Sequence, residues 1–128
     1  MMIYEIIRCA VENVPELAGK VRPVAEVVDG LEAPFCIFNL VSSAPMRAMN
    51  GLTVATTDTL ELGFEAAMLD DAVSLAQAVE AQLLALAHQV TDDGDRILWI
   101  RCSQTDEDAL DVATDLMRHP VTVEVCWQ

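Results

Sequence analysis

The longest segment with one unbroken hydrophobic period is 70–90, DDAVSLAQAVEAQLLALAHQV, which contains neither glycine nor proline. Its apolar residues recur at steps of three and four, the spacing that places side chains on one face of an α-helix. Asp70 or Asp71 can cap the first turn, because a carboxylate accepts hydrogen bonds from free backbone N–H groups at the positive end of the helix dipole. The spacing predicts a helix over 70–90 with an apolar stripe made of Ala72, Ala76, Val79, Leu83, Leu86, Ala87 and Val90.

Two further apolar residues of this helix, Val73 and Leu84, fall outside the stripe. They make the apolar surface wider than contact with one sheet usually requires. Either the helix is almost engulfed, or part of it faces another chain. We therefore include Val73 and Leu84 among the candidate subunit-interface residues.

Upstream of this helix the sequence predicts a short helix and several strands. Helical spacing from Ile3 to Val14 is followed by Pro15, which disfavours helical geometry in the residue before it. Segment 21–28 contains Pro23, which cannot donate to a central ladder, so it is expected to be an edge strand or an extended arm, followed by a turn at Asp29-Gly30. The other predicted strands are 35–41, 59–66, 96–102 and 121–127, with a loop over 42–52 and an acidic turn over 91–95.

The sequence of segment 103–120 fits two alternative predictions. Residues 106–117 have helical spacing, and Thr105 with Asp108 fits a capping box. The same segment also fits a long acidic loop that leads into a strand beginning near Leu116.

The predicted order αβββαββ indicates an α+β fold, a two-layer sandwich with a mostly antiparallel sheet and both helices on one face. The 128 residues are enough for one domain, which we expect to span 1–128. Hydrophobic residues make up 53% of the chain, which is high for a monomer that must cover its own surface. No apolar run approaches the roughly 18 residues that a membrane span needs, and no export signal is recognisable. We therefore expect a soluble, cytoplasmic protein with apolar surface left for a partner.

The net charge of −14 argues against nucleic-acid binding, and the positions of the cysteines indicate no reactive or metal-binding role. An acidic field repels phosphate backbones, so sequence-specific binding to DNA or RNA is not expected. Four cysteines lie far apart in apolar segments, which predicts small buried hydrophobes in a cytoplasmic chain. They are Cys9, Cys36, Cys102 and Cys126.

No catalytic, cofactor or metal site is predicted, and we do not expect an enzyme. His88 and His119 have no ligand at metal-binding spacing; a polar place on the helix is expected for the first and a loop for the second. Cys36 and Cys102 fall in strand interiors without a positioned base. The acids Asp92, Asp93 and Asp95 lack the donor spacing of a calcium loop.

The predicted loop 42–52 is too apolar for a loop that meets only water. It carries Met46, Arg47, Met49 and Leu52 beside Asn50-Gly51. Flexible apolar side chains on a projecting loop suit contact with another protein. The alternative is that the loop folds back and covers its own core. These four residues are the other candidate subunit-interface residues.

The pattern as a whole resembles the tail-completion, or tail-terminator, proteins of long-tailed bacteriophages and prophages. An N-terminal helix is followed by an extended segment, a strand that begins at a proline, a projecting loop, an alternating strand, an Ala-rich helix and an alternating last strand with an aromatic residue. The segments that carry the resemblance are VRPV, PFCIFNLVS, NGL, TLELGFEA, DDAVSLAQAVEAQL and VTVEVCW.

The resemblance implies a structural protein that forms a ring, a hexamer, at the head-proximal end of the tail tube. Such a ring terminates the tube, supports head–tail joining and lets DNA pass through. The implied partners are further copies of the chain, the tail-tube protein and a head-completion or connector protein. The implied locations are the bacterial host cytoplasm during assembly and the virion tail afterwards.

One alternative from another class remains open, a small α+β ligand-binding or regulatory oligomeric module, since such folds host many functions. That alternative predicts a small oligomer, usually a dimer, and a metabolite that raises the melting temperature.

Overall fold

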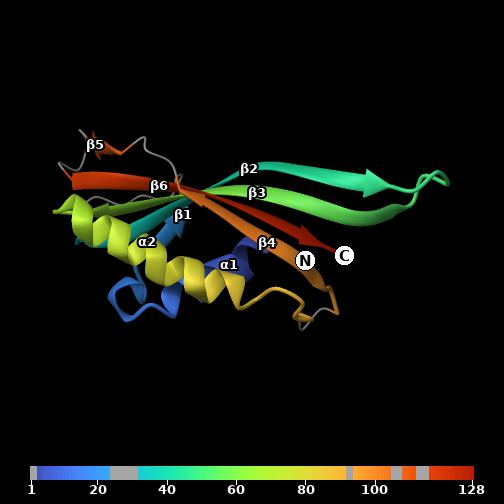
Figure 1. Cartoon of the computed structure of the whole chain (residues 1–128), viewed down its shortest axis with the longest axis horizontal. Coiled ribbons are helices and arrows are strands. Elements are labelled where there is room, and N and C mark those ends of the chain that lie inside the picture. Colours follow the sequence, from blue (N-terminus) through green and yellow to red (C-terminus); the bar gives the residue numbers. More distant parts are fainter. Residues whose placement is uncertain (1–2, 24–31, 92–93, 105–107, 112–115) are drawn as a thin grey trace.

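The computed structural model describes residues 3–23, 32–91, 94–104, 108–111 and 116–128. It is an α+β structure in which the helices α1 and α2 pack against a mixed sheet (Figure 1). The elements in chain order are α1 (Ile3–Glu12), the 3-10 helix η1 (Pro15–Leu17), β1 (Val21–Pro23), β2 (Phe35–Arg47), β3 (Thr53–Ala66), α2 (Leu69–Leu84), β4 (Ile97–Gln104), β5 (Ala109–Asp111) and β6 (Leu116–Trp127).

In the described part of the chain the strands follow the order β1-β2-β3-β6-β4, and the short β5 also pairs with β6. β1 runs parallel to β2, whereas the other pairings are antiparallel. The α+β class is therefore confirmed. The predicted order αβββαββ is wrong by one strand, because β5 lies between β4 and β6 in the sequence.

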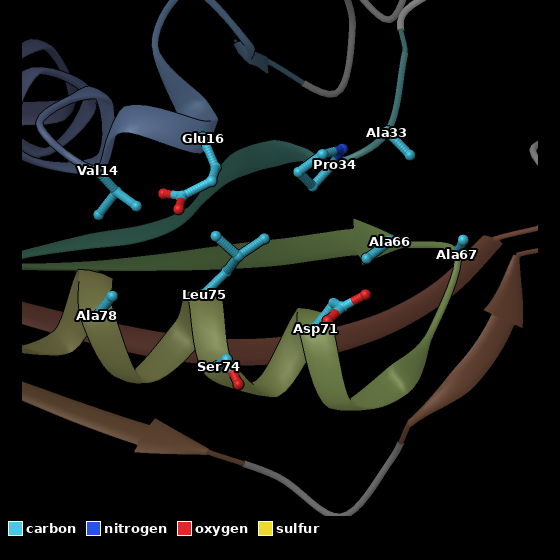
Figure 2. A pocket seen from close by; sticks show the side chains of 10 residues that line it. All are labelled: Val14, Glu16, Ala33, Pro34, Ala66, Ala67, Asp71, Ser74, Leu75 and Ala78. Atoms are coloured by element: carbon cyan, nitrogen blue, oxygen red, sulfur yellow. The ribbon is translucent and has the colours of Figure 1, made fainter.

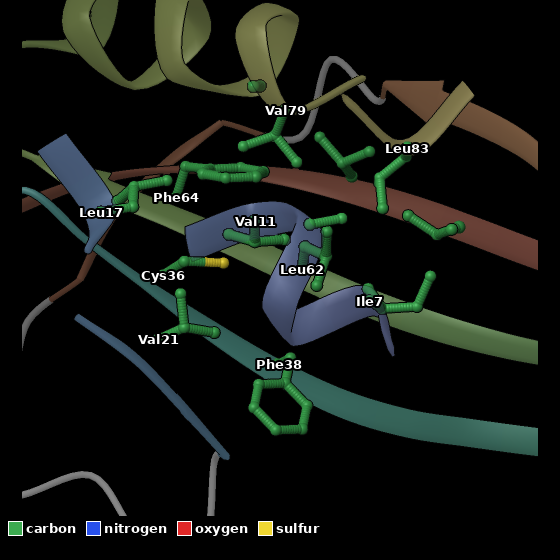
Figure 3. Packing of buried hydrophobic residues seen from close by; sticks show 14 of the residues in the cluster. Ile7, Val11, Leu17, Val21, Cys36, Phe38, Leu62, Phe64, Val79 and Leu83 are labelled. Atoms are coloured by element: carbon green, nitrogen blue, oxygen red, sulfur yellow. The ribbon is translucent and has the colours of Figure 1, made fainter. Parts of the chain in front are cut away.

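The hydrophobic core lies between the helices and one set of alternating sheet residues (Figure 3). Phe64 and Leu62 of β3 lie opposite Cys36 and Phe38 of β2, and all four are buried. Both helices add residues to the same cluster, because each has an apolar face that must be removed from water. The helical contributions are Ile7, Ala10, Val11, Ala72, Leu75, Ala76, Val79 and Leu83.

Helix α2 is shorter than the sequence predicts. It ends at Leu84, six residues before Val90, and the chain then turns back toward β4. The backbone N–H of His88 donates to Ile97 O at 2.7 Å, and Val90 forms an isolated bridge with Arg96. These contacts with the strand replace helical hydrogen bonds, so the prediction of a helix over 85–90 is wrong.

The start of α2 also differs from the prediction. Met68 is the N-cap residue and no side chain caps it, so Asp70 and Asp71 do not act as caps. Both lie in the first turn, where their carboxylates interact favourably with the helix dipole. Val73 is half-buried and Leu84 is 47% exposed, so the part of the helix outside the stripe is not engulfed.

The predicted loop over 42–52 is mostly strand. β2 continues to Arg47 and pairs with β3 up to Thr53, with register shifts after Leu40 and after Met46. Pro45 is tolerated because β1 pairs with β2 only at residues 36–38, so Pro45 lies on an edge of the sheet. Cross-strand pairing overrides the turn-like composition Ser-Ser-Ala-Pro.

In segment 103–120 the predicted strand that begins near Leu116 is confirmed, but the prediction of one long loop before it is wrong, because β4 extends to Gln104 and a short strand follows. Residues 109–111 form β5, and β6 begins at Leu116, so the described residues do not form the helix over 106–117. Thr105 of the capping box lies outside the described residues, as do 112–115.

The N-terminal predictions are confirmed where the structure describes them. The first helix ends before Pro15, which opens η1, and β1 is an edge strand that contains Pro23. Segment 24–28 and the turn at Asp29-Gly30 lie outside the described residues, as do Asp92 and Asp93 of the acidic turn. In the described part of the chain, neither helix has the length and apolarity that crossing a bilayer requires.

Candidate interaction surface

The β2–β3 hairpin extends beyond the region that the helices cover (Figure 1). The first four residues of β2 are buried and the following nine are exposed. Leu40 is 47% exposed, although Phe38 two residues earlier and Leu60 opposite it on β3 are both buried. The sequence therefore builds a sheet arm longer than its own core can cover.

The end of this arm is a compact turn between β2 and β3. Gly51 has φ +84, a conformation that other residues rarely adopt, and its N–H donates to Ala48 O at 2.9 Å. The Asn50 side chain accepts from the N–H of Leu52 at 3.0 Å, and Arg47 Nη1 donates to Gly51 O at 3.2 Å. The turn is thus held by its own hydrogen bonds. We call residues 46–52 the hairpin tip.

The hairpin tip exposes large apolar side chains. Met46 is 61% exposed, Leu52 is 66% exposed, and Met49 is fully exposed. Arg47 is exposed beside them. The alternative in which these side chains fold back over the core is wrong. Large exposed apolar side chains at the end of a projecting arm are typical of an interaction site.

A partly buried hydrogen bond links the arm to the body of the sheet. Trp127 Nε1 donates to Asp58 Oδ2 at 2.8 Å, linking β6 to the middle of β3. Asp58 is 4% exposed. Because β6 pairs with β3 as far as Thr56, the arm is supported along one side almost to its tip.

At the other end of the molecule a groove lies between α2, η1 and the ends of the neighbouring strands (Figures 1 and 2). Its volume is about 430 Å³. Val14, Leu75 and Ala78 give it an apolar lining, and Glu16 and Asp71 supply carboxylates. Ala66 and Ala67 also line it, and these small side chains leave the groove open. We call this the α2 groove. The groove could not be predicted from the sequence, because its lining comes from four separate segments.

The six candidate interface residues fall into two places. Four belong to the hairpin tip, whereas Val73 and Leu84 lie on α2. None of the six lines the α2 groove, which uses a different face of the same helix. The structure therefore brings together the tip residues but not the two helix residues with them. The six are Met46, Arg47, Met49, Leu52, Val73 and Leu84.

A polar cluster surrounds His119, which lies in β6 and is 4% exposed. The expected loop position is therefore wrong for His119, and the expected helix position is wrong for His88, which has φ +69 after the end of α2. His119 Nδ1 contacts Asp108, and Nε2 lies 3.1 Å from Gln104 Oε1. Gln104 in turn donates to Glu80 of α2 at 3.2 Å. The cluster joins α2, β4 and β6.

The cluster fits a structural role better than a chemical one. Gln104 Nε2 faces a carboxylate, so its Oε1 must face His119 and accept from it. Both imidazole nitrogens thus face acceptors, and His119 presents no free nitrogen to a metal or substrate. Among the described residues, no group of three or more His, Cys, Asp or Glu side chains is placed to hold a metal ion.

The cysteines differ in exposure, and the expectation that all four are buried is wrong for Cys9 on α1. Cys36 and Cys126 are buried and Cys102 is half-buried. Burial raises the pKa of Cys36 strongly, with a smaller contribution from Glu65. Burial and then the nearby Glu80 carboxylate raise the pKa of Cys102 to about 11. A raised pKa suppresses the thiolate, the nucleophilic form of cysteine.

These differences predict which thiol reacts first. At about pH 8 a water-soluble disulfide reagent should modify Cys9 rapidly, and the buried thiols only as fast as the protein opens. Cys102 should stay slow until the pH approaches its raised pKa of about 11. Absorbance of the released chromophore measures the rates. Cys9→Ser should remove the fast phase, and a fast phase that survives this change would contradict the assignment.

Comparison with known proteins adds no relative. The chain matches no family model, and the search of curated proteins found no match. The function must therefore be argued from the hairpin tip, the α2 groove and the composition.

Proposed function

We propose that this protein is a two-layer α+β structural subunit that assembles into a ring at the head-proximal end of a phage or prophage tail tube. In this role it terminates the tube and supports head–tail joining. The observation that carries the proposal is the projecting hairpin, whose tip exposes two methionines and a leucine to solvent. A subunit with such an arm is suited to contact a neighbour rather than to act alone.

The arrangement of the two candidate surfaces supports a ring rather than a symmetric dimer. The hairpin tip and the α2 groove lie at opposite ends of the molecule (Figure 1). Contact between two different surfaces is heterologous, and repetition of such a contact gives a closed ring when the rotation between subunits closes. A hexamer is the proposed closed form.

The charge of the chain supports the same role. Because each subunit has a net charge of −14, a ring of these subunits would surround DNA without binding its phosphate backbone tightly. The proposed partners besides further copies are the tail-tube protein and a head-completion or connector protein. The proposed locations are the bacterial host cytoplasm during assembly and the virion tail afterwards.

Solution mass tests the proposal directly. The wild-type chain should form a species of about six times the 14.0 kDa subunit mass, visible as rings by negative-stain microscopy. Replacing Met46 and Met49 together by aspartate should leave a folded monomer, because the added charges would have to be buried in the contact.

A matched control adds two charges elsewhere. Ala18 and Ser103 are exposed and lie outside the hairpin, so Ala18→Asp with Ser103→Asp should assemble like wild type. Rings that persist unchanged in the Met46→Asp, Met49→Asp variant would exclude the hairpin tip as the contact. A wild-type monomer at every concentration would contradict self-assembly.

The α2 groove favours one second candidate, the ligand-binding or regulatory module. Its volume of about 430 Å³ falls in the range of small-molecule sites. That function predicts a dimer or monomer whose melting temperature rises on addition of a metabolite. The same mass measurement distinguishes it from the ring.

A further inference from the structure

We propose that the α2 groove of one subunit receives the hairpin tip of the next. This inference rests on the proposed function and names the contact by which the ring is built. The occupant of the groove is a second copy of this chain, and the residues that enter it are Met46, Arg47 and Met49.

The first argument is the match between apolar surfaces. The tip ends in Met49, whose side chain is fully exposed, and Met46 is 61% exposed beside it. The groove offers an apolar lining from Val14, Leu75 and Ala78 in a volume of about 430 Å³. Methionine side chains are flexible and adapt to irregular apolar cavities. Docking would remove both surfaces from water together.

The second argument is charge complementarity. The chain has 7 Lys and Arg residues against 21 Asp and Glu residues, so an unspecific contact between two copies tends to be repulsive. Yet the hairpin tip carries a cation, Arg47, and the groove carries the carboxylates of Glu16 and Asp71. A guanidinium has five N–H donors, and the contact with Gly51 O uses one. Arg47 can therefore keep its hydrogen bond within the tip and also pair with a carboxylate of the groove.

The third argument is geometry. The tip belongs to a turn with its own hydrogen bonds at the end of a paired hairpin, so its backbone is already ordered and loses little entropy on docking. The groove is likewise formed by elements that belong to the packed body of the protein. The two surfaces lie at opposite ends, so each subunit can give a tip to one neighbour and receive a tip from the other (Figure 1).

Charge reversal tests the pairing. Arg47→Glu should weaken assembly about tenfold or more, because it places like charges together at the contact. Asp71→Arg should weaken assembly to a similar extent for the same reason. Both changes in one chain should restore assembly in part, since the opposite charges at positions 47 and 71 then attract again while the Glu16 carboxylate stays in the groove. Sedimentation equilibrium against concentration measures the association constants.

Each reversal has a matched control. Arg101 is an exposed arginine on β4, and Arg101→Glu makes the same charge change away from the tip. Asp70 precedes Asp71 in the first turn of α2 but does not line the groove. Asp70→Arg therefore disturbs the helix dipole in the same way as Asp71→Arg. Both controls should assemble like wild type.

Covalent trapping gives an independent readout. In a Cys9→Ser background, Met49→Cys combined with Ala67→Cys should form disulfides between subunits under mild oxidation, giving a ladder of covalent oligomers on a denaturing gel. Met49→Cys combined with Ser103→Cys should give no ladder, because Ser103 lies on β4 away from the groove.

The outcomes separate this inference from the proposed function. Rings that form in wild type and persist in both single reversals would overturn the docking of the tip in the groove and leave the ring intact. A second outcome would also overturn the docking of the tip in the groove: Arg47→Glu prevents assembly, Asp71→Arg does not, and the double variant is not restored. The tip would then bind another surface. A wild-type chain that stays monomeric would overturn the proposed function itself.

Discussion

Phe64→Ala is expected to lower the free energy of unfolding by about 3–5 kcal/mol, the range for removing a large aromatic side chain from a packed core. Phe64 is fully buried near the C-terminal end of β3 and packs beneath α2 beside Val79 (Figure 3). Its loss leaves a cavity between sheet and helix that neither can close without breaking other contacts. Urea unfolding followed by circular dichroism measures the change.

The measurement needs a monomeric reference, because assembly adds concentration-dependent stability. The Met46→Asp, Met49→Asp background is expected to supply it. Glu61→Ala is the matched control, since Glu61 lies on the same strand but is exposed. That change should alter the free energy of unfolding by no more than about 0.5 kcal/mol. A loss below about 1 kcal/mol in Phe64→Ala would contradict the burial of this residue in the shared core.

The fold class was readable from the sequence because periodicity reports which faces are buried. Alternation over 59–66 and 121–127 places Leu62 and Val123 in the core, and both are fully buried in β3 and β6. The helical period of α2 likewise predicts the burial of Val79 and Leu83. These patterns depend on local spacing alone, which a sequence displays directly.

What the sequence did not reveal depends on contacts between distant segments. Residues 42–47 are rich in turn formers and form a strand because β3 pairs with them along their length. Residues 88–90 have helical spacing, but contacts with the start of β4 determine their backbone. The α2 groove arises where η1, β3 and α2 meet. The apolar composition of the hairpin tip could be seen in the sequence, whereas the choice between a projecting loop and one that folds back over the core could not be made.

A second large effect is expected on the opposite face of the sheet, where Glu65 and Arg118 are directly paired between β3 and β6. Glu65 is fully buried, and Arg118 Nη2 lies 3.3 Å from its Oε2. The Arg118 side chain crosses Gly63, where an added Cβ would lie 3.3 Å from Arg118 Cδ. Glycine at 63 thus leaves room for the arginine to reach the carboxylate.

Arg118→Met is expected to destabilise the protein, because it removes the positive charge beside the buried Glu65 carboxylate. Removing one member of a fully buried ion pair costs about 3–5 kcal/mol, because the other charge stays buried. Arg118 is 40% exposed, so water already screens part of the attraction, and we expect a loss of about 2 kcal/mol. Urea unfolding in the same monomeric background measures it.

A double-mutant cycle separates this electrostatic cause from lost packing. Glu65→Gln removes the buried charge while keeping the shape of the side chain, so Arg118→Met should cost much less in the Glu65→Gln background than alone. The difference between the two costs is the coupling between the charges. If the two changes are simply additive, Arg118 acts through the packing of its aliphatic chain over Gly63 rather than through its charge.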